Sequence, residues 1–217
     1  MGGIGGGETE IRVLGLGNVL MGDDAAGPWV VEHLRAGWDF GPGVSVTDLG
    51  TPGLDLVPHL SGARIVVLVD TVKSDAPPGT LRLYRRDEVL KHPPSPRTSP
   101  HDPAVKETLL YLELAGSGPE ELLLVGIVPG SVEKGLGLTP AVAAAVPRAA
   151  DAVLDELRRL GVAVELAGGR GETLPDEPPA LFLRDDHPLL PEQPLVIGRR
   201  GDRHRGAEHA VPERDIA

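Results

Sequence analysis

Short apolar runs recur between residues 11 and 128 and predict the strands of a sheet. The run at 64–69, RIVVLV, is apolar after its first residue, which is typical of a parallel strand covered on both faces. The segment at 80–84 follows a Pro-Pro-Gly turn and is expected to be antiparallel at an edge. In all, strands are predicted at Ile11–Leu16, Val44–Asp48, Arg64–Val69, Thr80–Tyr84 and Glu121–Val128.

Between these runs, apolar residues spaced three and four apart predict helices. A first helix is expected to start near Gly27. Three others begin with an N-cap residue followed by proline, at Thr51-Pro52, Asp102-Pro103 and Thr139-Pro140. The helix over 103–115 is expected to end at Gly116. The helix over 139–160 is expected to kink or break at Pro147, because proline lacks the backbone N–H that a helix interior needs.

The alternation of strands and helices predicts the fold class. We expect an α/β protein: a single three-layer αβα domain with a mostly parallel central sheet of about five strands. The domain is expected over 11–167, after a flexible leader at 1–10. Residues 168–217 are rich in glycine, proline and charge, a composition that predicts a mostly disordered tail.

Composition and charge narrow the classes of function. The chain has 217 residues, no cysteine and a formal net charge of -11. Without cysteine, a metal site must use oxygen and imidazole ligands. The acidic balance argues against nucleic-acid binding. The sequence has neither the pattern of a signal peptide nor an apolar run long enough to cross a membrane. We therefore expect a cytoplasmic protein that does not associate with membranes.

The stretch at 13–31, VLGLGNVLMGDDAAGPWVV, combines an apolar strand, a glycine-rich turn and two adjacent carboxylates. A dinucleotide-binding turn needs a third glycine where this chain has Leu20, which disfavours a nucleotide-binding module. Asp23 and Asp24 repel each other unless a cation or a proton relieves them. One of the two is expected to cap the following helix. The pair as a whole is as compatible with a cation site as with a structural role.

Two further residues complete a possible metal site. Asp70 follows a buried strand and is expected at the carboxyl edge of the sheet, where open α/β sheets bind ligands, although it could also form a turn. His101 precedes a helix N-terminus, which favours the neutral imidazole of a metal ligand; the alternative is an exposed loop histidine. Asp24, Asp70 and His101 together would suit a borderline ion such as nickel or zinc. Asp48, by contrast, is expected to make a turn rather than contact a ribose.

Five motifs, in this order, resemble the hydrogenase maturation endopeptidase family: GLGNVLMGDDAAG, DLGTPGLDLVPHL, IVVLVDTV followed by PPGTL, TSPHD, and VGIVPGSVEKGLGLTPAV. The resemblance spans about residues 11–160. It implies an endopeptidase, grouped with the aspartic-type peptidases, that removes a C-terminal peptide from the nickel-loaded large-subunit precursor of a [NiFe] hydrogenase. The family's metal-contacting positions carry over to Asp24, Asp70 and His101, which are the implied catalytic and metal-binding residues. The nickel is expected to arrive with the substrate, so that the isolated protein, expected to be a monomer, is metal-free.

Two mechanisms follow from the resemblance. In the first, the three side chains capture the substrate's nickel, which polarises the scissile carbonyl or a water, and Asp23 is the helix cap. In the second, the aspartates share a proton and act as acid and base. We favour the first, because a histidine among the ligands fits coordination better than a carboxylate dyad. A different class of function is a non-proteolytic accessory protein of hydrogenase assembly that binds or senses nickel in the same crevice.

Overall fold

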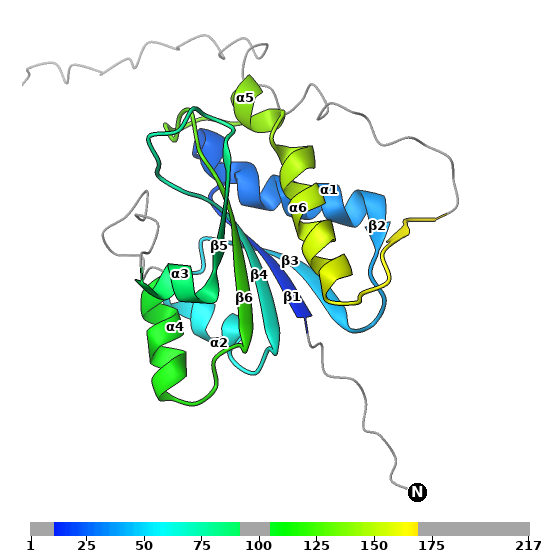
Figure 1. Cartoon of the computed structure of the whole chain (residues 1–217). Coiled ribbons are helices and arrows are strands. Elements are labelled where there is room, and N and C mark those ends of the chain that lie inside the picture. Colours follow the sequence, from blue (N-terminus) through cyan, green and yellow to red (C-terminus); the bar gives the residue numbers. More distant parts are fainter. Residues whose placement is uncertain (1–10, 92–104, 169–217) are drawn as a thin grey trace, which may run out of the picture. The chain divides into compact units, whose positions relative to one another are not determined.

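The computed structural model describes residues 11–91 and 105–168, and its centre is a five-stranded sheet of order β3-β1-β4-β6-β5 (Figure 1). The strands are β1 (Ile11–Leu16), β3 (Val44–Gly50), β4 (Ile65–Thr71), β5 (Leu81–Arg85) and β6 (Glu121–Ile127). The first four in sheet order are parallel, and β5 runs antiparallel to β6 at the edge. All five predicted strands are confirmed. The predicted leader at 1–10 and residues 169–217 of the predicted tail lie outside the described residues.

Helices cover both faces of the sheet, which confirms the predicted α/β fold with its three layers (Figure 1). One face carries α1 (Ala26–Gly37), α5 (Pro140–Ala143) and α6 (Val146–Arg159), and the other carries α2 (Leu56–Leu60), α3 (Arg86–Lys91) and α4 (Val105–Leu114). Side chains of β4 alternate between the two layers: Val67 and Val69 pack with the first, Val66 and Leu68 with the second. Each is fully buried and stabilises the fold by about 1.5–3 kcal/mol. This two-sided burial explains the unbroken apolar run.

The last helical segment is broken as Pro147 predicts. Helix α5 ends at Ala143, and α6 begins at Val146 with Pro147 in its first turn. A missing N–H costs nothing there, because the first backbone donors of a helix have no partner within the helix. The pattern at 139–160 is therefore that of two helices rather than one. The helix expected from Thr51-Pro52 starts as a 3₁₀ turn, η2 (Gly53–Asp55), before α2.

Three short elements were not predicted. Helix α3 follows β5 directly, and the antiparallel pair β2 (Trp38–Asp39) and β7 (Glu165–Leu166) lies apart from the main sheet. A two-residue strand is too short to show a period in the sequence. Helix α3 has a visible local signal in Glu88, whose carboxylate accepts a hydrogen bond from Arg85 N at 2.7 Å, as in a capping box.

Two glycines let α1 lie unusually close to the sheet. A Cβ on Gly27 would be 2.2 Å from Leu16 O and 2.6 Å from Val69 O. On the facing strand, a Cβ on Gly15 would be 2.7 Å from Gly27 O. Neither position can hold a side chain without moving backbone. This close approach fixes the start of α1 against the ends of β1 and β4, where the predicted site lies.

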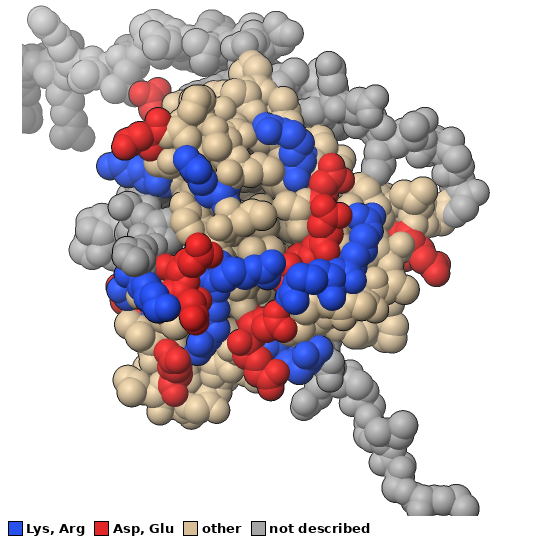
Figure 2. Space-filling model, viewed as in Figure 1, with Lys and Arg blue, Asp and Glu red and all other residues tan. Residues whose placement is uncertain are grey.

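Described acidic and basic side chains are interspersed over the face shown in Figure 2. This surface differs from the continuous basic field that binds nucleic-acid backbones. Within residues 11–91 and 105–168, no helix is both long enough and apolar enough to cross a bilayer.

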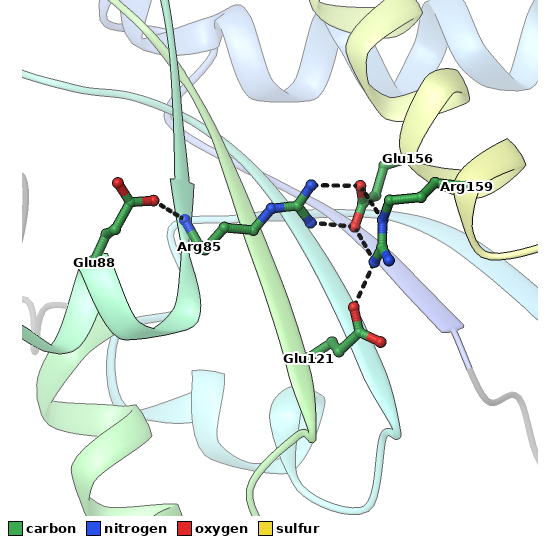
Figure 3. Close-up of polar contacts among 5 residues, drawn as sticks. All are labelled: Arg85, Glu88, Glu121, Glu156 and Arg159. Atoms are coloured by element: carbon green, nitrogen blue, oxygen red, sulfur yellow. Dashed lines mark hydrogen bonds and ion pairs between the residues drawn. The ribbon is translucent and has the colours of Figure 1, made fainter.

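An ion-pair network of three described elements joins α6 to the sheet (Figure 3). Glu156, buried on α6, accepts hydrogen bonds from Arg85 Nη2 of β5 at 2.9 Å and from Arg159 Nε at 3.0 Å. Arg159 also pairs with Glu121 at the start of β6. Burial raises the pKa of Glu156, but hydrogen bonds and charges of the two arginines outweigh it and lower this pKa from its ordinary 4.5 to about 2.

The lowered pKa of Glu156 predicts a loss of stability in acid. The ion pairs contribute fully above pH 4.5, and this contribution disappears as the pH falls towards 2. Both arginines are partly exposed to solvent, which weakens the ion pairs. We therefore expect them to contribute about 2 kcal/mol to the free energy of unfolding. In urea unfolding followed from pH 6 to pH 2, Glu156→Gln should flatten the acid side of the stability profile. The exposed Glu120→Gln is the matched control, and equal profiles for both variants would contradict the prediction.

Candidate active site at the carboxyl edge of the sheet

The turn after β1 has a backbone path that only glycine can follow. Gly17 has φ of +139°, and a Cβ there would lie 1.8 Å from Asp24 O. The chain then turns through Asn18 into a 3₁₀ helix, η1 (Gly22–Ala25), which leads directly into α1. The glycine-rich turn thus places the peptide of Asp24 against the end of β1. This turn holds the carboxylate of Asp24 in place.

Asp24 is buried and held by both of its carboxylate oxygens. Oδ2 accepts a hydrogen bond from Asn18 N at 2.9 Å, and Oδ1 accepts one from Thr71 Oγ1 at 3.2 Å. The first bond comes from its own turn and the second from the end of β4. A carboxylate oxygen has more than one lone-pair direction, so each can accept a hydrogen bond and still face a cation.

Asp70, at the end of β4, is linked to Asp24 through its neighbour Thr71. The Asp70 Oδ1 accepts a hydrogen bond from Thr71 N at 2.7 Å, while the hydroxyl of Thr71 donates to Asp24. Thr71 itself is buried. Strands β1 and β4 are neighbours in parallel register, Gly15 beside Val69, so their carboxyl ends meet. The segments that carry Asp24 and Asp70 therefore meet at this edge, and the joint role of the two residues in a site stays a prediction.

His101, the third predicted ligand, lies at 92–104, outside the described residues. Within the part of the chain that the structure describes, no cluster holds three or more potential histidine, aspartate or glutamate ligands. Of the three predicted site residues, the structure therefore describes Asp24 and Asp70. An imidazole from the segment before α4 remains a prediction for the third position.

The expectation that Asp23 caps α1 is wrong. The N-cap of α1 is Ala25, which makes no side-chain cap hydrogen bond. The turn η1 instead directs the fully buried Asp23 towards the loop at 128–139. Its Oδ2 accepts from Gly130 N at 2.7 Å, Ser131 N at 2.9 Å and Thr139 Oγ1 at 2.9 Å, and its Oδ1 from Thr139 N at 2.6 Å. Asp23 thus anchors a loop distant in sequence to the corner that carries Asp24.

Two further residues have structural roles, and the role of Asp48 is the one expected from the sequence. Asp48 makes a turn, since its Oδ1 accepts from Gly50 N at 2.8 Å. His33 packs on α1 against Trp38, with ring centroids 5.6 Å apart. Burial lowers the pKa of His33, with Asp151 acting in the opposite direction.

Comparison with known proteins identifies the chain. Residues 28–156 match the hydrogenase maturation protease family. The hydrogenase expression/formation protein HoxM of Azotobacter vinelandii is 33% identical over 200 residues, which cover 86% of this chain and 97% of that protein. The hydrogenase 2 maturation protease of Escherichia coli is 36% identical over 154 residues, covering 70% and 93%.

The fold agrees with this assignment. The solved structure of the hydrogenase maturating endopeptidase HybD from E. coli is similar with a TM-score of 0.67 and 33% identity, over 73% of this chain and 98% of that one. The class of protein is therefore a peptidase, a hydrolase built on an α/β domain. The chain belongs to the hydrogenase maturation protease family, as the sequence motifs implied.

Sequence reasoning missed two residues of this corner. Thr71 donates its hydroxyl to Asp24, but a threonine at the end of a strand looks like any other β-branched residue there. The role of Asp23 depends on donors of the loop at 128–139, among them the hydroxyl of Thr139, which donates to Asp23 and accepts no hydrogen bond from an N–H of its own helix. Both contacts join segments far apart in the chain, so no local pattern reveals them.

Proposed function

We propose that this protein removes a C-terminal peptide from the nickel-loaded large-subunit precursor of a [NiFe] hydrogenase. Its family and its similarity to HybD, a hydrogenase maturating endopeptidase, support a processing peptidase. The observation that carries the proposal is that Asp24 and Asp70 lie on segments that meet at one edge of the sheet, where Thr71, the chain neighbour of Asp70, donates its hydroxyl to Asp24. Two carboxylates held at a common edge suit capture of a divalent cation better than a purely structural role.

The proposed ligands are Asp24, Asp70 and His101, which recognise nickel carried by the substrate. Two carboxylate oxygens and an imidazole nitrogen form a donor set that borderline divalent ions accept. A bound nickel ion supplies Lewis acidity towards the scissile carbonyl or a water. The residues of this chain contribute position: Asn18 and Thr71 hold Asp24, and Thr71 holds Asp70.

Burial of Asp24 also favours a role in cation capture over a proton-sharing dyad. A buried carboxylate is costly unless it is hydrogen-bonded or paired, and the hydrogen bonds from Asn18 N and Thr71 Oγ1 hold this one at the edge of the sheet. A cation arriving with the substrate would add the opposite charge. The energetic gain would then depend on the metal, which makes cleavage conditional on nickel loading.

The test is cleavage of the precursor with and without nickel. The protein is mixed with nickel-loaded large-subunit precursor or with the nickel-free form, and the mass of the large subunit is followed by mass spectrometry. We expect the loaded precursor to shorten at its C-terminus and the nickel-free form to stay intact. Equal cleavage of both forms would contradict recognition through nickel. Tight nickel binding with no cleavage would instead favour an accessory protein that senses the metal.

A further inference from the structure

A small group of apolar side chains is exposed beside the candidate active site. Val19 is 46% exposed, Leu20 56% and Leu136 70%. We call these three residues the apolar rim. Val19 and Leu20 lie on the turn that holds Asp24, and Leu136 lies on the loop anchored by Asp23.

The backbone under the apolar rim is firmly hydrogen-bonded. Leu20 O accepts from Gly135 N at 2.9 Å, and Gly22 N donates to Gly135 O at 2.9 Å. These bonds join the turn after β1 to the loop at 128–139, so that Leu136 follows a residue paired with Leu20. Leu20 N also donates to Asn18 Oδ1 at 3.0 Å. The exposed leucines are therefore presented on fixed backbone, which reduces the entropy lost when a partner binds.

The rim is also continuous with the carboxylate of Asp24. Asn18 N donates to Asp24 Oδ2, and Val19 is the next residue along the chain. Residues 17–22, GNVLMG, carry no charged side chain. The centre of a protein interface is typically poor in charge and rich in apolar contact. A protein substrate whose reacting segment approaches Asp24 would have to pass over the rim.

We infer that the apolar rim docks an apolar surface of the hydrogenase large-subunit precursor next to the segment that is cleaved. This inference rests on the proposed function, since it deepens the recognition of the same substrate. The carboxylates would recognise the metal, and the rim would recognise the folded protein around it. Affinity for the precursor would then come from two adjoining sources with different chemistry.

The experiment measures binding and cleavage separately. Wild-type protein, Leu20→Ser, Leu136→Ser and the double variant are tested for binding to immobilised full-length precursor, and for kcat and KM on the nickel-loaded form. Each buried leucine is expected to account for about tenfold in affinity. The double variant should therefore bind about 100-fold more weakly, with KM raised and kcat nearly unchanged. Leu136→Met should bind as the wild type does.

Leu114→Ser is the matched control. Leu114 is 92% exposed at the end of α4, at the opposite, amino-end side of the sheet from the carboxylates. Wild-type binding by the double variant, or an equal loss in Leu114→Ser, would overturn the inference, as would a wild-type protein that does not bind precursor. If the wild-type protein binds the precursor through the rim but does not cleave it, the inference is supported and the proposed function is overturned. The protein could also form a dimer that the rim substitutions dissociate while precursor binding stays intact. That result would assign the apolar rim to contact with a second copy and would overturn the inference.

Discussion

Replacing Asp70 with alanine is expected to lower the rate of precursor cleavage by more than about 100-fold. Loss of a residue that only supports a metal ligand costs up to about 100-fold in activity, and the proposed direct ligand should cost more. The substitution removes a carboxylate at the carboxyl edge of the sheet and leaves Thr71 to hold Asp24. The measurement is the initial rate of large-subunit shortening with nickel-loaded precursor. The loss should appear in both kcat and KM, because the metal contact is proposed to supply affinity as well as to take part in the reaction.

Two controls make this result specific to the site. Asp87→Asn removes an exposed carboxylate on α3 that pairs only loosely with Lys91, at 3.7 Å, and is expected to leave the cleavage rate unchanged. His101→Ala is expected to reproduce the loss seen with Asp70→Ala, because both are proposed to contact the same metal. Cleavage at the wild-type rate by Asp70→Ala would exclude the metal-centred mechanism.

Much of the fold could be predicted because its signals are local. The apolar run of β4 specifies a strand buried on both faces, and Pro147 specifies the start of a helix. Both follow from the chemistry of neighbouring residues. The pair β2 and β7 was out of reach for the opposite reason: Trp38 and Leu166 are far apart in the chain, and each strand has only two residues.

The candidate site could be predicted only in outline. The positions of Asp24 and Asp70 follow from their places at strand ends, because parallel strands bring their carboxyl ends to one edge. The hydrogen bond from Thr71 to Asp24 joins β4 to the turn after β1, and no spacing in the sequence reveals it. Asp23 was assigned wrongly for the same reason. The general preference of aspartate for helix N-caps was outweighed by donors more than 100 residues away.

Asp23→Asn is expected to destabilise the protein by about 2–4 kcal/mol, although the two side chains have nearly the same shape. The carboxylate of Asp23 accepts from three donors at Oδ2 and from Thr139 N at Oδ1. An amide has only one accepting atom, so whichever way it is turned, its NH₂ group faces a backbone or hydroxyl donor. With Oδ1 of the asparagine towards Gly130 and Ser131, the NH₂ would face Thr139 N at a position where the carboxylate oxygen lies 2.6 Å away.

The measurement is the free energy of unfolding from urea titrations, with Asp48→Asn as the control. Asp48 is exposed and accepts one backbone hydrogen bond, at 2.8 Å, which an asparagine oxygen can retain. The free energy of unfolding of Asp48→Asn should therefore differ from that of the wild type by less than about 0.5 kcal/mol. An unchanged unfolding midpoint for Asp23→Asn would show that the loop at 128–139 does not depend on this carboxylate. Loss of the anchor would also loosen the loop that carries Leu136, so weaker precursor binding should accompany the loss of stability. Substitution of Asp23 would then change precursor binding and stability together, whereas the rim substitutions would weaken binding without changing stability. This difference distinguishes a residue that positions the loop from residues that contact the substrate.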